Sequence, residues 1–286
     1  MNWITASLLM FASSVALYLV VRKATLLKVP THITNLAMFT IPLVFFVLLH
    51  AGKGESYSVS FSGIAILLLA GIIFAFGGNT ASLRAIKEAP NPGYSLVLSK
   101  SYVLFTTIVA LIIFNAELSI RKAIGILVIV GFSALIMVDP SKTKKMAKKN
   151  HWLALSIGAF FAWGSLSLSA KYLFNKGLGT YTFLLYLYLV VTICILIKLF
   201  VDRQKLYHIM DHKWVLLFIG IFSTTFNLFQ FEAIKLAPNI GYVNAINAGS
   251  IALVTVLAVL VFKDDFSIKK FIGVVGVIAG IIMLLV

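Results

Sequence analysis

The chain has 286 residues with a net charge of +15, 61% hydrophobic and 12% charged residues, and a mean hydropathy of +1.04. Soluble domains carry about a quarter charged residues, so this composition excludes an ordinary soluble protein and is typical of a chain built for lipid. The basic residues lie in short loops and form no basic domain, so we expect no nucleic-acid partner. The single Cys194 excludes an intramolecular disulfide and a cysteine metal cluster.

Apolar runs long enough to cross a bilayer follow one another along the chain. A membrane helix needs about 20 mainly apolar residues. The first run lacks a preceding basic region, so we interpret it as a retained span and not as a signal peptide. The predicted fold class is therefore an all-α, multi-pass integral membrane protein. The ten expected spans are residues 2–21, 31–50, 60–83, 92–114, 120–138, 151–171, 179–200, 213–234, 240–262 and 268–286.

A turn between two of these spans occurs twice. Residues 86–94 read Ile-Lys-Glu-Ala-Pro-Asn-Pro-Gly-Tyr, and residues 234–242 read Ile-Lys-Leu-Ala-Pro-Asn-Ile-Gly-Tyr, so seven of nine positions are identical at a displacement of 148 residues. A fixed displacement of this kind indicates two copies of one unit. The same displacement pairs Asn79 with Asn227, Phe114 with Phe262, Glu117 with Asp265, Lys122 with Lys270 and Gly125 with Gly273.

The repeat divides the chain into three parts. We expect a first five-helix repeat at residues 1–140, a basic linker at 141–150 and a second five-helix repeat at 151–286. Five spans per copy make the second copy enter the membrane in the opposite sense, so the repeat is inverted. Inverted repeats are typical of transporters, whose substrate sites lie near the midplane where the repeats meet. The repeated turn itself is interpreted as structural, because proline suits a first helical turn and glycine permits close approach.

The distribution of positive charge predicts an orientation. Seventeen of the 24 lysines and arginines lie in loops after odd-numbered spans, six lie in loops after even-numbered spans, and Lys100 lies within a span. Because lysine and arginine favour cytoplasmic loops, this count places both termini outside the cytoplasm.

Short motifs in both copies resemble a known family. Each copy contains Ala-x-Lys-x-Ala-Pro, from Ala85 and Ala233, and then Ser-Ile-x-Lys-x-x-Gly, from Ser119 and Ser267. This pattern resembles the EamA-type repeat of the drug/metabolite transporter (DMT) superfamily. Ala162-Trp163-Gly164 with Lys171 resembles the Trp-Gly…Lys opening of such a repeat, whereas the first copy departs from it with Val15-Ala16.

The resemblance implies ten transmembrane helices, arranged as two inverted five-helix repeats around a central cavity. It implies secondary transport of a small metabolite, commonly export of amino acids or similar solutes, in a prokaryotic plasma membrane. Relatives are often drawn with both termini in the cytosol, which conflicts with the charge count and leaves the orientation open.

Polar side chains deep within spans are the candidates for substrate binding, because an unpaired polar group in hydrocarbon is costly. Serine and threonine often join helices, whereas an amide offers a donor and an acceptor to a neutral or zwitterionic solute. Lys100 lies deep enough in its span to anchor a carboxylate or to pair with an internal acid. The candidate substrate-binding residues are Asn79, Ser99, Lys100, Tyr102, Trp163, Asn227, Gln230, Asn244 and Asn247.

Glu232 is the only carboxylate within a predicted span, and its partner in the repeat is Arg84. Both are candidates for coupling or gating, although a solvated role near a span end is the simpler interpretation. The first span has no carboxylate, so the proton-coupled glutamate of the small multidrug branch has no counterpart here. If protons drive transport, Glu232 is the expected site, and facilitated diffusion or exchange remains open.

Other functions have less support from the sequence. There is no Gly-x-Ser-x-Gly motif, and all five histidines lie at span ends or in loops, so we expect no buried base, no catalytic residue, no metal site and no cofactor. A channel would need a continuous polar file or a charged ring. A lipid-linked precursor carrier, a nucleotide-sugar-like carrier or a scramblase of the same fold remains an alternative. The expected partners are a small-molecule substrate and the lipid bilayer, and the protein is expected to be a monomer or a homodimer.

Overall fold

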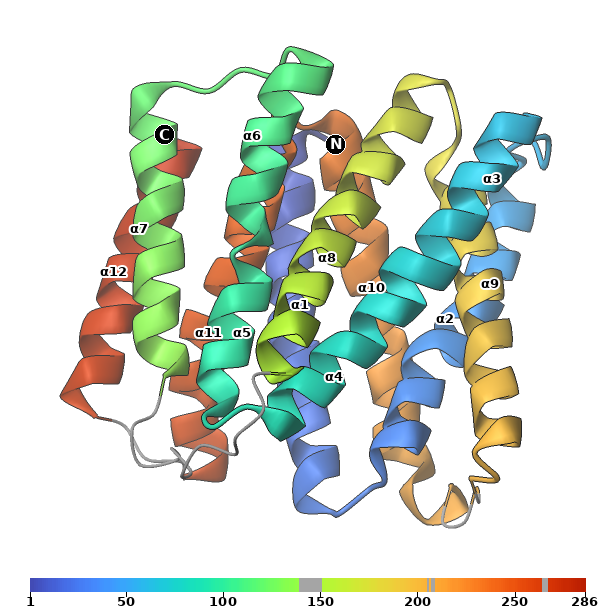
Figure 1. The fold of residues 1–286 in the computed structure, drawn as a ribbon, viewed down its shortest axis with the longest axis horizontal. Coiled ribbons are helices and arrows are strands. Elements are labelled where there is room, and N and C mark those ends of the chain that lie inside the picture. The colour runs from blue at the N-terminus through green and yellow to red at the C-terminus, as the bar shows by residue number, and fades with distance from the viewer. Residues whose placement is uncertain (139–150, 205, 207–208, 264–266) are drawn as a thin grey trace. The chain divides into compact units, whose positions relative to one another are not determined.

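The computed structural model describes residues 1–138, 151–204, 206, 209–263 and 267–286 (Figure 1). These residues are helical apart from short connections. The predicted linker at 141–150 and the predicted repeat partner Asp265 lie outside the described residues. The elements are α1 (Trp3–Leu26), α2 (Thr31–Lys53), α3 (Phe61–Leu69), η1 (Ala70–Gly77), α4 (Gly78–Glu88), α5 (Pro92–Lys100), α6 (Tyr102–Phe114), α7 (Ile120–Met137), α8 (His151–Asn175), α9 (Thr180–Val201), η3 (Met210–His212), α10 (Lys213–Leu236), α11 (Ile240–Phe262) and α12 (Ile268–Leu285).

Ten helical segments among the described residues are long and apolar enough to cross a membrane, which confirms the prediction of ten spans. The third is longer than expected and runs from Phe61 to Glu88 through α3, η1 and α4. Its middle part, η1, is a π-helix, a conformation that is often found at functional sites. The fourth span is interrupted at Ser101, between α5 and α6.

The helices form two compact units. The first unit contains Met1–Ile72 and Ser169–Lys235, and the second contains Ile73–Leu168 and Leu236–Val286. Each unit therefore combines segments from the first and the second half of the sequence. Compact units and sequence repeats are different divisions of the chain, so the boundaries of the repeats remain a prediction.

In the first unit, α2 packs against α9, and the two helices lie side by side in Figure 1. Phe46 and Tyr188 meet edge to face, with 4.9 Å between their ring centroids. A second contact joins α2 to α10, where a Cβ at Gly220 would lie within 2.4 Å of the Ile41 side chain. The absence of a side chain at Gly220 thus permits the two helices to approach closely.

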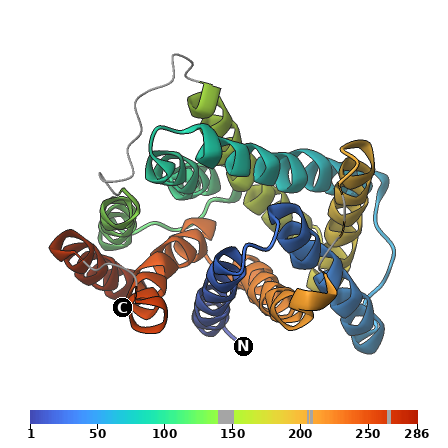
Figure 2. The same cartoon turned by 90° about the horizontal axis from the view of Figure 1, so that it is seen from below.

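In the second unit, α7 and α12 form the most extensive helix pair, and both views show them together (Figures 1 and 2). A Cβ at Gly125 of α7 would lie 3.1 Å from the Gly280 carbonyl oxygen and 3.2 Å from Met283 Cβ. A Cβ at Gly273 of α12 would lie 3.2 Å from the Phe132 carbonyl oxygen. The beginning of each helix therefore meets the end of the other, so the pair is antiparallel.

These contacts are also reciprocal. Gly125 and Gly273 are separated by the repeat displacement, and so are Phe132 and Gly280. Each glycine of the first pair therefore contacts the opposite helix at equivalent positions. Reciprocal contacts of this kind are typical of two-fold symmetry, in which equivalent surfaces of two copies contact each other.

Candidate functional site

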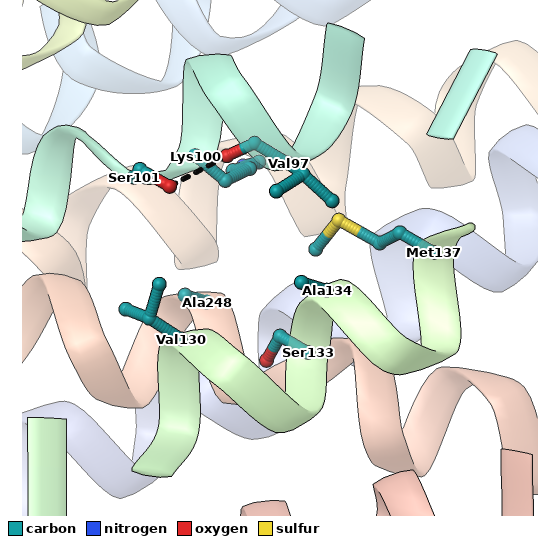
Figure 3. A pocket seen from close by; sticks show the side chains of 8 residues that line it. All are labelled: Val97, Lys100, Ser101, Val130, Ser133, Ala134, Met137 and Ala248. Atoms are coloured by element: carbon teal, nitrogen blue, oxygen red, sulfur yellow. Dashed lines mark hydrogen bonds between the residues drawn. The ribbon is translucent and has the colours of Figure 1, made fainter. Parts of the chain in front are cut away.

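Lys100 lines a small cavity in the second unit (Figure 3). Val97, Lys100 and Ser101 border it from the α5–α6 segment, α7 contributes four residues, and Ala248 contributes from α11. The cavity measures about 10 Å³, which is room for about one water molecule. It is therefore too small to hold a metabolite in this conformation.

Ser133 gives this cavity a polar wall that the sequence analysis missed. Its side chain is buried, and its Oγ has no hydrogen-bond partner among the described residues. An unsatisfied buried hydroxyl costs about 1–3 kcal/mol, so a bound water or a polar ligand atom would stabilise this site. Ser133 could not be identified from the sequence, because its place across the cavity from Lys100 depends on how α5 and α7 pack.

The repeated turn fixes the start of the helix that carries Lys100. The Gly93 amide donates to Asn91 Oδ1 at 2.9 Å, so the asparagine caps α5. In the second copy the Gly241 amide donates to Asn239 Oδ1 at 2.8 Å. A Cβ at Gly93 would collide with the Met137 backbone, so the expected close approach at glycine is present. The asparagine caps were not predicted, although asparagine directly before a helix is a signal for them.

The α5 helix ends at Lys100, and the chain continues as α6 after Ser101. The Ser101 amide and its Oγ both donate to the Val97 carbonyl oxygen, at 3.0 and 2.8 Å. Next to this interruption, Ser99 and Tyr102 are both buried, and Ser99 Oγ donates to the Leu96 carbonyl oxygen at 3.2 Å. The bond of Ser99 lies within its own helix, so it does not tie α5 to a neighbouring helix.

The two asparagines of α11 are both buried. Asn244 Nδ2 donates to Thr106 Oγ1 of α6 at 3.1 Å, which is the kind of bond that holds membrane helices together. Asn244 Oδ1, in contrast, has no hydrogen-bond partner among the described residues. Asn247 lies one position before Ala248, which borders the cavity. Asn244 therefore joins two helices with one end of its amide and leaves the other end available.

The remaining predicted residues of the second unit lie on α4 and α8. Asn79 is half-buried on α4, and Trp163 is half-buried on α8. Arg84 is exposed, with 62% of its side chain accessible, and its Nε lies 2.6 Å from Glu88 Oε1. Glu88 Oε2 also lies 2.7 Å from His151 Nδ1. Arg84 thus belongs to an exposed ion-pair network, which typically contributes little to stability.

In the first unit, α10 carries the predicted substrate residues Asn227 and Gln230 and the predicted coupling residue Glu232. Asn227 is half-buried, and its Nδ2 donates to the Ser223 carbonyl oxygen at 2.8 Å. Ser223 Oγ in turn donates to the Met38 carbonyl oxygen of α2 at 2.9 Å. Gln230 is buried, whereas Glu232 is half-buried. The structure therefore divides the predicted site residues between the two units, with these three in the first.

One expectation about histidine is wrong. His50 lies in the last turn of α2, as a span end predicts, but its side chain is only 1% exposed. The reason is that α9, which is distant in sequence, covers it: His50 Nε2 lies 3.1 Å from Thr182 Oγ1. The chain therefore does contain a buried imidazole. Its signal in the sequence was a histidine at the end of an apolar run, which does not predict burial.

No group of three or more histidine, cysteine, aspartate or glutamate side chains is close enough to share a metal ion within the described parts of the chain. Around the predicted residues the structure brings together amides, hydroxyls and the Lys100 ammonium group, and elsewhere it joins the His50 imidazole through Thr182 to the Glu55 carboxylate. Such groups bind solutes, water or protons by hydrogen bonds and charge.

Comparisons with known proteins agree with these observations. The sequence pattern of the EamA-like transporter family matches residues 150–286. A comparison with curated proteins gives no match. A crystal structure described only as that of a protein is similar with a TM-score of 0.81 and 14% identity, and the match covers 98% of this chain and 96% of that one. At this identity the likeness concerns the fold alone.

Ten apolar helices and the family match lead to the same conclusion. The protein is an integral, multi-pass membrane protein. Residues 150–286 match the EamA-like transporter family of the drug/metabolite transporter superfamily, whose members are membrane transporters.

Proposed function

We propose that the protein is a secondary carrier that exports a small polar metabolite, an amino acid or a related solute, by alternating access. The family supports transport as such. The choice of solute rests on the side chains inside the spans, which combine one ammonium group with several amides and few carboxylates. An ammonium group can bind the carboxylate of a solute, and amides can bind its other polar groups. Together they suit a zwitterionic solute such as an amino acid.

The observation that carries the proposal is the position of Lys100. It lies near the middle of the span Pro92–Phe114, is half-buried, and borders a cavity with the unsatisfied Ser133 Oγ opposite. A charged side chain at this depth is costly and marks a functional site by default. An ammonium group in this place is suited to hold the carboxylate of a solute.

We further infer that the repeat is inverted. The reciprocal contacts of Gly125 and Gly273 in the antiparallel α7–α12 pair support a two-fold relation between the copies. Local backbone conformation repeats as well, because Asn115 and Lys263, which are separated by the repeat displacement, both end helices with positive φ angles of 49° and 58°. A two-fold axis of this kind, lying in the membrane plane, relates the halves of inverted-repeat transporters.

The proposed substrate contacts are Lys100 with Ser99, Tyr102 and Asn247 in the second unit, together with Asn79, Trp163 and Asn244. Asn227 and Gln230 are the proposed contacts in the first unit. We also propose that the protein works in a prokaryotic plasma membrane as a monomer or homodimer, without a nucleic-acid partner and without chemical conversion of its substrate.

Counter-flow in liposomes tests this function. Purified protein is reconstituted with an unlabelled metabolite inside, and uptake of the same labelled metabolite is measured across a panel that includes the amino acids. We expect exchange of at least one amino acid, and reduced exchange in Lys100→Ala, Asn227→Ala and Asn247→Ala at unchanged folded yield. Exchange that is unchanged in all three variants would contradict the proposed site, and exchange of lipid-linked or nucleotide-linked compounds alone would contradict the proposed solute class.

A further inference from the structure

A buried cluster in the first unit joins the end of α2 to the beginning of α9. His50 Nε2 lies 3.1 Å from Thr182 Oγ1. The same hydroxyl lies 3.0 Å from Glu55 Oε2 and 3.0 Å from the Ser56 carbonyl oxygen. His50 and Thr182 are each 1% exposed. One threonine hydroxyl therefore connects a buried imidazole to a carboxylate that is half-buried.

The hydrogen bonds determine which imidazole nitrogen carries the proton. Thr182 Oγ1 has one hydrogen, and both Glu55 Oε2 and the Ser56 carbonyl oxygen can only accept it while the carboxylate is ionised. His50 Nε2 must then be the donor to Thr182 Oγ1. The neutral imidazole is consequently the Nε2–H tautomer, and its Nδ1 carries a lone pair.

That lone pair is unsatisfied. His50 Nδ1 is buried and has no hydrogen-bond partner among the described residues. A buried unpaired acceptor costs about as much as a lost hydrogen bond, so its presence calls for a reason. Nδ1 is also the only position at which this neutral imidazole can take up a proton, and the Thr182 hydroxyl links the ring to the negative charge of Glu55.

The surrounding charged and titratable groups fit a proton site. The Thr182 amide donates to Glu55 Oε2 at 2.8 Å, so the carboxylate sits at the N-terminus of α9, where a negative charge is stabilised. The Tyr57 ring lies 4.1 Å from the imidazole ring. Lys53 of the same helix lies over the Tyr181 ring at 6.0 Å. Tyr181 also interacts electrostatically with Glu55 and with Glu232 of α10. Of these groups, Glu55 is the one that hydrogen bonds link to the imidazole, through Thr182 Oγ1.

We propose that His50, held by Thr182 and Glu55, is a proton-binding site that couples this carrier to a proton gradient. The inference rests on the proposed transport function, and it places coupling at His50 in preference to Glu232, which is half-buried and has a less enclosed setting. One proton from water binds Nδ1 and is released from the same atom when the cycle returns.

Coupling follows because the neutral and the protonated imidazole need different hydrogen-bond partners. The packing described here satisfies the neutral imidazole at Nε2 and offers nothing to an N–H at Nδ1. The imidazolium therefore favours a different arrangement of the α2 end against α9, in which Nδ1 meets an acceptor or water. A ligand that binds one arrangement better shifts the population toward it, and here the ligand is a proton.

The test uses the full chain in liposomes and one probe, a mixture of radiolabelled amino acids, in two assays. The first measures counter-flow at equal pH on both sides, and the second measures accumulation driven by a gradient of about one pH unit, imposed in either sense with the membrane voltage clamped. One coupled proton per solute can hold up to about tenfold accumulation in such a gradient. We expect wild type to perform both, and His50→Gln, which keeps a donor for Thr182 but cannot take a proton, to keep counter-flow and lose accumulation.

His151→Gln is the matched control, because His151 is an exposed histidine of the other unit that pairs with Glu88. It should behave as wild type in both assays. Glu55→Gln should lower gradient-driven accumulation at least about threefold with counter-flow retained, and it replaces His50→Gln if that variant does not fold. Accumulation that persists in His50→Gln, or counter-flow without any accumulation in wild type, would overturn the proton site while leaving transport intact.

A substrate-independent measurement separates this inference from the proposed function. If no amino acid exchanges in wild type, the proposed solute is wrong, yet His50 can still be followed by the NMR signals of its imidazole in nanodiscs. The signal that disappears in His50→Gln should belong to the Nε2–H tautomer and should change to the imidazolium as the pH is lowered. A signal that stays neutral down to the lowest pH at which the protein remains folded would contradict the proton site.

Discussion

Polar side chains inside the apolar helices of this protein have two different surroundings. Some are satisfied by a neighbouring helix, as Ser156 Oγ is by Ser95 Oγ at 2.9 Å. Others keep an atom that has no partner among the described residues, and His50 Nδ1, Ser133 Oγ and Asn244 Oδ1 are three of these. Unsatisfied buried atoms are costly, so residues of the second kind are the better candidates for binding a proton, water or solute.

Asn91 offers a prediction about local stability. Replacing the cap with alanine removes the acceptor for the Gly93 amide and should cost about 1 kcal/mol, whereas Asn91→Ser keeps an uncharged acceptor in this buried position and should cost less. Thermal unfolding in detergent measures the difference as a lower Tm for Asn91→Ala than for Asn91→Ser. Equal melting temperatures for the two variants would show that the cap does not stabilise α5.

The bond between Asn244 and Thr106 distinguishes helix joining from solute binding. Thr106→Val removes the partner of Asn244 Nδ2 and should destabilise the protein by about 1–3 kcal/mol, because the buried amide then loses its remaining interhelical bond. Adding Asn244→Leu should restore part of that loss, since both polar partners are then gone. Chemical denaturation of the three variants provides the cycle, and additive losses would show that the two side chains do not interact.

At the scale of helices, the ten spans could be predicted because length and apolar character are local properties of the sequence. The interruption at Ser101 could not, because that position has neither proline nor glycine to announce it. The burial of His50 could not either, since Thr182, which lies 132 residues later, covers it. Local patterns thus show where a helix runs, whereas the site depends on which helices pack together.

Close packing of α7 on α12 gives a prediction with a control on the same helix pair. A Cβ at Gly276 would collide with the Phe132 ring, whereas a Cβ at Gly131 of α7 would meet nothing within 4 Å. Gly276→Ala should therefore cost about 1–3 kcal/mol through overpacking. Gly131→Ala should be neutral or stabilise by up to about 1 kcal/mol through helix propensity. The two melting temperatures would coincide if α7 and α12 did not pack in this way.

For the whole molecule, the sequence predicted the class of protein, whereas its substrate residues remain a prediction. The duplication, the apolar runs and the family motifs can all be read along the chain without knowing which helices pack together. The family match on residues 150–286 confirms the predicted resemblance to the EamA-type family. The candidate residues instead fall into two compact units that each combine both halves of the chain, with Asn227 and Gln230 in one and Lys100 and Asn247 in the other. Pairing within a sequence repeat does not predict that division, because it arises from packing between distant spans such as α2 and α9.

Competition by amino-acid carboxamides tests most directly whether Lys100 holds the carboxylate of a transported solute. In wild-type liposomes we expect an exchanged amino acid to inhibit counter-flow at concentrations at least about tenfold lower than its carboxamide, because a hydrogen bond to a charged group is worth about 1.5–3 kcal/mol. Lys100→Gln should lose this discrimination, while Lys176→Gln, which changes an exposed lysine, should keep it. Equal inhibition by acid and amide in wild type, or full discrimination in Lys100→Gln, would contradict a carboxylate site at Lys100.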